Sequence, residues 1–286
     1  MSSSNSNHKA HIMFKQFNKS LIAVALAGLA MNAHAHRGWM VPSSTMVESK
    51  DAWVTVDAAV SDGLFDIDHQ PLRLDALQVI GPDGAKVTPA NTVTGRLRSV
   101  FDVKMEKPGT YKAAIVSQNV MGSYKLNGEQ KRFRGNEETF KKEVPADAQE
   151  LKITRTAARL ETFFSNGETS TEVFKPTGVG LEFVPVTHPN DLRAGEKATW
   201  RFLVDGKPAA NQAFSLVPGG VRYRGVLGEI RQSTDAKGEI TFTVPAAGMY
   251  YLSSTWPAAA PAVAGQPPVM PERRMTYAAT VEVLPQ

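Results

Sequence analysis

Three histidines carry most of the chemistry that this sequence could support. The chain has 286 residues with six histidines and no cysteine. Without thiolates, any metal ion must be held by His, Asp, Glu, Met or backbone groups. If residues 1–35 are removed, His36 becomes the first residue and offers an imidazole nitrogen beside a free α-amine. These two nitrogens suit Cu(II), Ni(II), Co(II) and Zn(II), so we expect His36 to be a metal ligand.

Two further segments could complete such a site. His69 follows Asp66 and Asp68 in a loop rich in oxygen donors, although an extended loop would point both carboxylates away from the imidazole. The spacing does not fit a calcium-binding loop. His188 lies in a turn, where a hydrogen-bonded structural role is the alternative interpretation. The predicted ligands for a divalent Ni, Co or Cu ion are His36, His69, Asp68 and His188.

Other reactive patterns are weaker. Arg222 and Arg224 would share one face of a strand and form an anion clamp, or they could be charged residues that protect a sheet edge. The sequence has no Gly-x-Ser-x-Gly, no His-Glu-x-x-His and no glycine-rich phosphate loop. We therefore expect no catalytic residues, and a protein that is not an enzyme.

The N-terminus is typical of an export signal. Lys9, Lys15 and Lys19 precede an apolar run over residues 21–30, and Ala-His-Ala at 33–35 is a cleavage site. The run is shorter than the ~20 residues that span a bilayer, and no Cys follows for lipid attachment. We predict a signal peptide over 1–35 and a periplasmic protein without a membrane anchor. The remainder carries 29 Lys and Arg against 28 Asp and Glu, which does not favour nucleic acid as a partner.

Alternation of apolar and polar residues predicts an all-β fold. Period-two patterns recur between turns rich in Gly, Pro and Asp, as in antiparallel sandwiches. The clearest predicted strands are the segments 54–60, 77–79, 101–105, 111–115, 200–204, 240–244 and 277–283. The predicted architecture is two immunoglobulin-like or transthyretin-like antiparallel β-sandwich domains in tandem.

A weak repeat sets the predicted domain boundaries. Gly109-Thr-Tyr111 and Gly248-Met-Tyr250 each place a Gly-x-Tyr at a strand start, although such an entry also occurs by chance. We predict an N-terminal domain over 36–145, a connecting segment over 146–178 and a C-terminal domain over 179–286. A short helical turn is expected at 145–148, and a Pro-rich loop at 257–271.

The mature start His-Arg-Gly-Trp-Met-Val-Pro resembles that of the domain-of-unknown-function family 4198. Further motifs of the C-terminal half are similar to the same family, namely residues 180–192, 205–209, 234–238 and 248–250. Members are often described as periplasmic nickel- or cobalt-uptake components. The resemblance implies an exported two-domain β protein linked to metal acquisition, with His36 as a ligand.

These observations favour a periplasmic metal-binding accessory protein that passes a metal ion or metal complex to an envelope transporter. Two alternatives remain open. One is an immunoglobulin-like interaction module without metal, whose partner binding would not respond to chelators. The other is a copper oxygenase with a histidine brace, similar to lytic polysaccharide monooxygenases, for which we identify no aromatic substrate face.

Overall fold

A computed structural model describes residues 36–258 and 270–286. The chain divides into two units, Met1–His36 and Arg37–Gln286. The predicted signal peptide lies outside the described residues. Within the part that is described, no helix is long and apolar enough to cross a membrane.

The prediction of a mainly β protein is confirmed. Each segment with clear alternation forms a strand, because its apolar face is buried while the other face is polar. These strands are β3 (Trp53–Ser61), β5 (Leu77–Ile80), β8 (Ser99–Lys104), β9 (Gly109–Leu126), β13 (Lys197–Val204), β17 (Glu239–Thr243) and β19 (Arg273–Val283).

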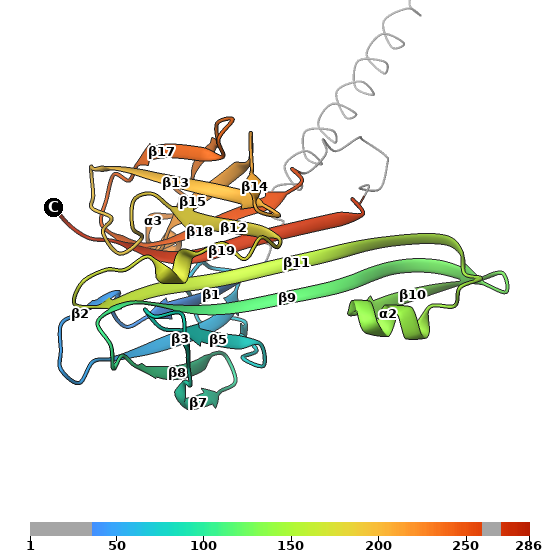
Figure 1. Ribbon diagram of the computed structural model, residues 1–286, viewed down its shortest axis with the longest axis horizontal. Helices are drawn as coiled ribbons and strands as arrows, with labels where there is room; N and C mark the ends of the chain where they lie inside the picture. Colours follow the sequence, from blue (N-terminus) through green and yellow to red (C-terminus); the bar gives the residue numbers. More distant parts are fainter. Residues whose placement is uncertain (1–35, 259–269) are drawn as a thin grey trace, which may run out of the picture. The chain divides into compact units, whose positions relative to one another are not determined.

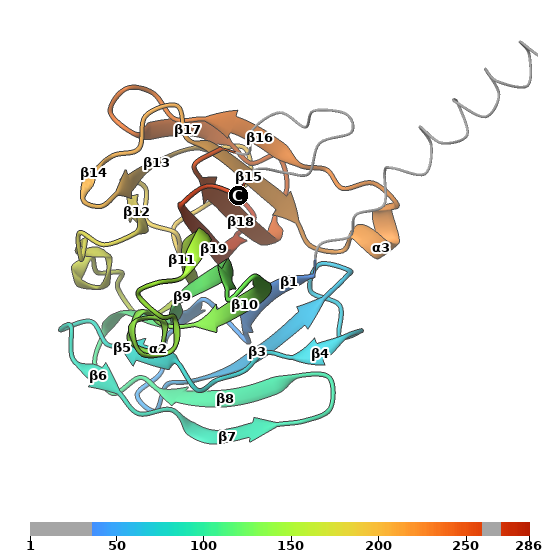
Figure 2. The ribbon, with the colours of Figure 1, turned by 90° about the vertical axis from the view of Figure 1, so that its right-hand side faces the viewer.

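Three sheets make up the unit Arg37–Gln286 (Figures 1 and 2). The five-stranded sheet contains β3 and β8 with β1 (Arg37–Pro42), β4 (Gln70–Pro71) and β7 (Ala90–Thr94). The four-stranded sheet contains β13 and β17 with β12 (Leu181–Pro185) and β14 (Lys207–Pro208). The ten-stranded sheet contains β5, β9 and β19 with β2 (Met46–Val47), β6 (Lys86–Val87), β10 (Glu129–Gly135), β11 (Gln149–Asn166), β15 (Ala213–Pro218), β16 (Ile230–Ser233) and β18 (Gly248–Trp256). Figure 2 shows the ten-stranded sheet between the other two.

Strand β11 contributes to two hydrophobic cores. Phe164 is buried with Phe101 and other residues of the five-stranded sheet, whereas the adjacent Phe163 is buried with Trp200 and other residues of the four-stranded sheet. Successive side chains of a strand point to opposite faces, so one strand can fill both cores. The predicted connecting segment 146–178 therefore contains the strand that the two sandwiches share. The division into two domains stays a prediction.

The sequence patterns predict antiparallel strands throughout, but two strand pairs are parallel. β11 runs parallel to β19 over residues 155–162 and parallel to the short β2. On its other edge β11 pairs antiparallel with β9 along almost its whole length. The parallel pair with β19 is the seam at which strands of the C-terminal half join those of the N-terminal half.

The repeated Gly-x-Tyr is a repeated structural motif. Tyr111 Oη donates to the carbonyl oxygen of Lys107 at 2.9 Å, and Tyr250 Oη donates to that of Ala246 at 2.8 Å. Each tyrosine thus bonds back to the residue four positions upstream, like the tyrosine corner of immunoglobulin-like sandwiches. The preceding Gly109 and Gly248 have φ of 118° and 141°, which explains glycine at both positions.

An arm extends the central sheet beyond both sandwiches (Figure 1). We define it as residues 119–155, which contain the distal parts of β9 and β11, all of β10 and the helix α2 (Glu137–Glu143). β9 and β11 have 18 residues each, or about 60 Å at ~3.3 Å per residue. A capping box between Asn136 and Thr139 starts α2. The predicted helical turn at 145–148 is instead a turn after this helix.

One face of the arm is closed by α2. Val120, Tyr124 and Phe133 are buried there, and Phe140 of the helix packs against them with its ring 5.5 Å from that of Phe133. The helix covers one face of the three strands. The opposite face, called the open face below, is covered at Thr154, which is buried and donates to the carbonyl oxygen of Pro271.

Candidate functional site

His188 occupies a half-buried structural position. Its Nδ1 accepts a hydrogen bond from the backbone N–H of Asn190 at 3.1 Å. Its Nε2 lies 3.0 Å from Thr110 Oγ1 and 3.2 Å from the carbonyl oxygen of Ser170. Burial lowers the pKa of His188, which favours the neutral ring. Because both ring nitrogens have protein partners, this geometry matches the hydrogen-bonded alternative more closely than a metal ligand.

The loop after β3 holds the two halves of the unit together. Leu64 is buried with Trp39 and Val217, and Phe65 stacks edge-on against Trp39 with 5.8 Å between ring centroids. Phe65 has a φ of 63°, a conformation that costs free energy for a bulky residue. Asp68 accepts from the backbone N–H groups of residues 62 and 63 at 3.2 and 3.1 Å. Its carboxylate therefore shapes the loop.

The described residues contain no group of three or more His, Asp and Glu side chains that could hold a metal ion. His36 and His69 are exposed, and β1 begins at Arg37, directly after His36. The pairing of Arg37 with Ser61 ties this start into the sheet, as the apolar sequence after His36 predicts. The four predicted ligands and the metal ion stay a prediction, and two of the four, Asp68 and His188, already have partners within the protein.

The arginine pair at 222 and 224 lies on a short helix and not on a strand. In α3 (Val221–Arg224) the Arg224 guanidinium donates to the carbonyl oxygens of Pro218 and Leu227 at 3.1 and 3.2 Å. Arg222 forms an ion pair with Asp66 at 3.4 Å. Both side chains are bound within the protein, and this arrangement favours neither the anion clamp nor the sheet-edge role that the sequence left open.

A buried charge network joins four strands near the seam. Glu161 accepts from Tyr277 Oη at 2.8 Å and lies 3.3 Å from Arg159 and 3.7 Å from Lys112. Arg159 also lies 3.7 Å from Glu182, which accepts two backbone N–H bonds. Two cations and two carboxylates balance one another, and burial raises the pKa of Tyr277. The network therefore fixes the positions of the strands and offers no reactive group.

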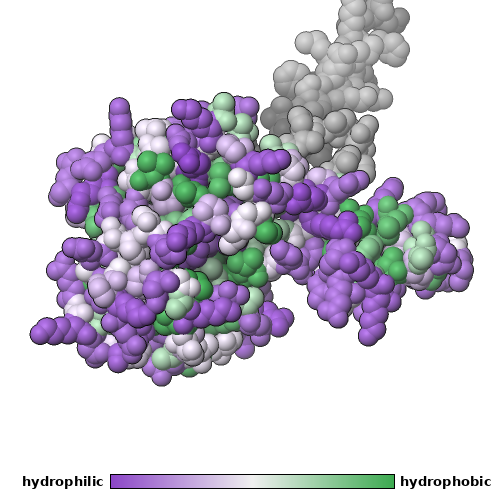
Figure 3. Space-filling view, viewed as in Figure 1, coloured by the Kyte–Doolittle hydropathy of each residue, from purple (hydrophilic) through white to green (hydrophobic). Residues whose placement is uncertain are grey.

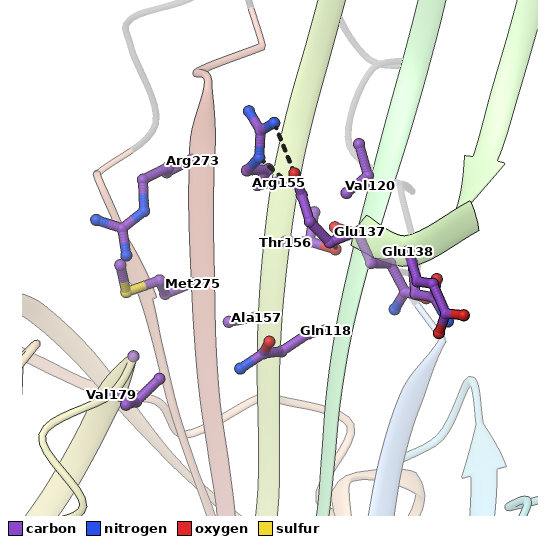
Figure 4. A pocket seen from close by; sticks show the side chains of 13 residues that line it. Gln118, Val120, Glu137, Glu138, Arg155, Thr156, Ala157, Val179, Arg273 and Met275 are labelled. Atoms are coloured by element: carbon purple, nitrogen blue, oxygen red, sulfur yellow. Dashed lines mark hydrogen bonds and ion pairs between the residues drawn. The ribbon is translucent and has the colours of Figure 1, made fainter. Parts of the chain in front are cut away.

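A hollow of about 460 Å³ lies on the covered face, between α2 and the loop before β12 (Figure 4). Figure 4 shows Gln118 and Ala157 between its two walls. Arg155 on one side is bound by Glu137 through two contacts of 2.9 and 3.1 Å, and its guanidinium lowers the pKa of that carboxyl. Arg273 on the other side is bound by Asp205 at 3.0 Å. The arginines of this hollow are thus neutralised.

The open face of the arm has a different charge pattern. Strand pairing aligns Arg132, Ser123 and Lys152 in one row across β10, β9 and β11. The next row contains Arg134, Met121 and Thr154. Because Phe133 points into the α2 cluster, Arg132 and Arg134 on either side of it point to the opposite face. We call these two rows the trough.

Within residues 36–258 and 270–286, the cations of the trough form no ion pair. Among the described residues, no carboxylate pairs with Arg132, Arg134 or Lys152, and all three are exposed. In contrast, the neighbouring Lys125 of β9 is paired with Glu150 at 2.6 Å. The acidic side chain that lines the same groove is Glu272.

The groove along the trough measures about 1150 Å³. Its apolar contributors include Met121, half-buried in the floor, together with Leu151 and Met270, which are 46% and 51% exposed. Figure 3 shows hydrophobic residues bordered by hydrophilic ones on the side of the arm that carries α2. Apolar surface rimmed by polar groups is typical of interaction sites.

Sequence reasoning missed this site because the residues 127–177 look like a mixed, charged connection. The available signal was Lys131-Arg132-Phe133-Arg134, in which one apolar residue alternates with cations after the turn at Asn127-Gly128. A hairpin prediction there would have placed Arg132 and Arg134 on one face.

Comparison with known proteins gives a family but no activity. The model of the family "Domain of unknown function (DUF4198)" matches residues 33–257, so the chain belongs to this family, as its sequence motifs had indicated. No curated protein matches.

Two similar solved structures are the D0-D1 domain of intimin and a DUF4785 family protein from Legionella pneumophila. Each is 12% identical to this chain with a TM-score of 0.21. The first alignment covers 86% of this chain and 97% of the intimin domain, and the second covers 75% and 50%. TM-scores this low do not establish a shared fold.

Proposed function

We propose that this protein is an immunoglobulin-like interaction module that binds a partner through its arm, and that it is not an enzyme. The observation that carries the proposal is the trough, where Arg132, Arg134 and Lys152 have no carboxylate partner among the described residues and lie beside an exposed apolar groove. Two other cations, Arg155 at the edge of the same groove and Arg159 further along β11, are bound by acidic side chains of the chain.

The shape of the arm supports this proposal. β9 and β11 continue past the last residues that fill the two sandwich cores, and the small α2 cluster stabilises only one face of the extension. A sheet that extends into solvent with one open face buries less apolar surface than the same residues would within a sandwich. Packing alone therefore does not account for the extension, whereas the binding of a partner to its open face would.

The polar side chains of the interior support a role without catalysis. Ser165 and Thr110, which lie 2.9 Å apart beside His188, are fully buried and bonded within the core. A nucleophile must reach its substrate, and these hydroxyl groups do not meet solvent.

A random-decapeptide library, selected on the wild-type chain, tests the proposal without assuming the chemistry of the partner. Enriched peptides are then measured against Arg132→Glu/Arg134→Glu and against Arg96→Glu, an exposed arginine of the loop before β8. We expect binding to fall for the arm variant, to persist for the control and to be insensitive to EDTA. Peptides that bind both variants equally, or a library without enrichment, would overturn the proposal.

A second function, transition-metal binding, rests on His36. The paired strand that begins at Arg37 would give a chain cleaved after Ala35 an anchored first residue. His36→Ala should then lower the affinity for Ni(II), Co(II) or Cu(II) in a titration of the mature protein. Equal affinity in both forms would remove the metal role and leave the interaction module unaffected.

A further inference from the structure

We infer that the partner segment is an extended acidic peptide with carboxylates at three successive positions, held in the trough by Arg132, Arg134 and Lys152. This inference rests on the proposed function and names the chemistry of the partner. It depends on three features: the spacing of the cations, the uncharged side chains between them, and the aliphatic side chains that line the groove.

The cations form two rims at opposite edges of the open face. Arg132 and Arg134 lie on β10, two residues apart, so their Cα atoms are separated by about 6.7 Å. Lys152 lies on β11, two strands away from Arg132 and therefore at about 9.5 Å. The strand between the rims carries Ser123 and Met121 in the same two rows, and neither is a charged side chain.

An extended peptide fits between such rims. When the peptide lies edge-on along the strand direction, its residues i and i+2 point to one side and residue i+1 points to the other. The i to i+2 repeat of an extended chain is also about 6.7 Å, which matches the separation of Arg132 and Arg134. Carboxylates at i and i+2 would then meet the two arginines, and one at i+1 would meet Lys152.

Guanidinium groups favour carboxylates because their paired N–H donors match the two oxygens of the acid. The apolar contacts of the groove, from Met121, Leu151 and Met270, fit the aliphatic parts of a peptide. Met side chains, which are unbranched and flexible, also adapt to different partners.

A single-stranded nucleic acid fits this surface less well. Proteins that bind it without sequence preference stack bases on exposed aromatic side chains. The aromatic residues of the arm, Tyr124, Phe133 and Phe140, are turned toward the α2 cluster and away from the trough. The open face offers cations and thioethers, which can neutralise an anion but cannot stack its bases.

The test uses the full chain and three fluorescent decapeptides. The first has Asp or Glu at three successive positions, in an otherwise neutral sequence of Ser, Thr and Val. The second has the same composition with its three acids four residues apart, and the third replaces the acids by Lys. Fluorescence anisotropy at low salt gives the Kd of each for wild type, Arg134→Glu and the control Arg96→Glu.

We expect the first peptide to bind wild type about tenfold more tightly than the second, and Arg134→Glu to weaken it by about tenfold. The Lys peptide should gain affinity for Arg134→Glu, while Arg96→Glu should behave as wild type. Binding of the first peptide should fall with salt, because the Debye length is only about 8 Å at 0.15 M.

Three results would overturn the inference. Equal Kd values for the first two peptides would show attraction by net charge alone, and no change in Arg134→Glu would place binding elsewhere. Tighter binding of an oligodeoxythymidine of equal charge, with loss in Arg134→Glu, would assign the trough to nucleic acid. If library selection yields neutral peptides that depend on the arm, this inference fails while the proposed function stands.

Discussion

The shared strand β11 makes a prediction about how the protein unfolds. Phe163 and Phe164 are adjacent and at most 1% exposed, yet they belong to different cores. If β11 couples the two sandwiches, losing either side chain should destabilise the whole unit Arg37–Gln286. If the two sandwiches were domains that fold independently, each substitution would destabilise only the sandwich that contains it.

The size of the effect follows from the burial of the two rings. Replacing a fully buried Phe by Ala costs about 3–5 kcal/mol, because transfer free energy is lost and a cavity remains. For a unit of this size, each kcal/mol lowers the melting temperature by about 2–4 °C. Phe163→Ala and Phe164→Ala should therefore each lower Tm by roughly 6–20 °C.

Differential scanning calorimetry measures this directly. We expect one transition in wild type and one transition in each variant, shifted as a whole. Val93→Ala, at an exposed position of β7, is the matched control and should leave Tm unchanged. Two transitions, with Phe163→Ala lowering one and Phe164→Ala lowering the other, would refute the coupling and support two separate domains.

Four further predictions concern single residues. Tyr111→Phe and Tyr250→Phe should each lower the free energy of unfolding in urea by about 1 kcal/mol, through the lost bond to the upstream carbonyl; a change in only one would deny that the two corners are equivalent. Burial lowers the pKa of His188 from its usual 6.5, so its contribution is full above that pH and declines as the pH falls through the lowered value. His188→Asn should flatten this part of the profile of stability against pH, by at most about 1.4 kcal/mol per pH unit, and an unchanged profile would contradict the assignment. Glu161→Gln should cost about 3–5 kcal/mol in the same urea assay, since it removes the carboxylate of Lys112 and one of the two carboxylates beside Arg159, and a cost below 1 kcal/mol would show that the network is dispensable. Mass spectrometry of the secreted protein should give a chain that begins at His36, and any other start would remove the metal hypothesis.

Period-two patterns predict most of the fold because each sandwich strand has one buried and one polar face. The pattern fails for β11, where Phe163 and Phe164 are both buried, since a strand that serves two cores has no polar face there to mark it. The parallel pair of β11 and β19 is also invisible in the sequence, because its partners lie more than a hundred residues apart and nothing local fixes their register.

The candidate site could be predicted only in part. Histidines draw attention for their chemistry, but whether His188 is a ligand depends on which groups packing brings to its nitrogens. Thr110 and Ser170 lie beside Nε2, and the backbone N–H of Asn190 bonds Nδ1. The trough escaped prediction because its cations come from two separate strands. Lys152 lies in the same row as Arg132 only because β10 and β11 both pair with β9. The cluster therefore depends on the strand register, which the sequence does not reveal.

Site-specific photocrosslinking in the organism that makes the protein tests the role of the arm most directly. Benzoylphenylalanine is placed at Leu151 beside the trough or, as a control, at Val93, both exposed apolar positions. We predict one discrete adduct from Leu151, none from Val93, and loss of the adduct when Arg134→Glu is added. An adduct that survives Arg134→Glu, equal adducts at both positions, or none at Leu151 would contradict a partner-binding arm.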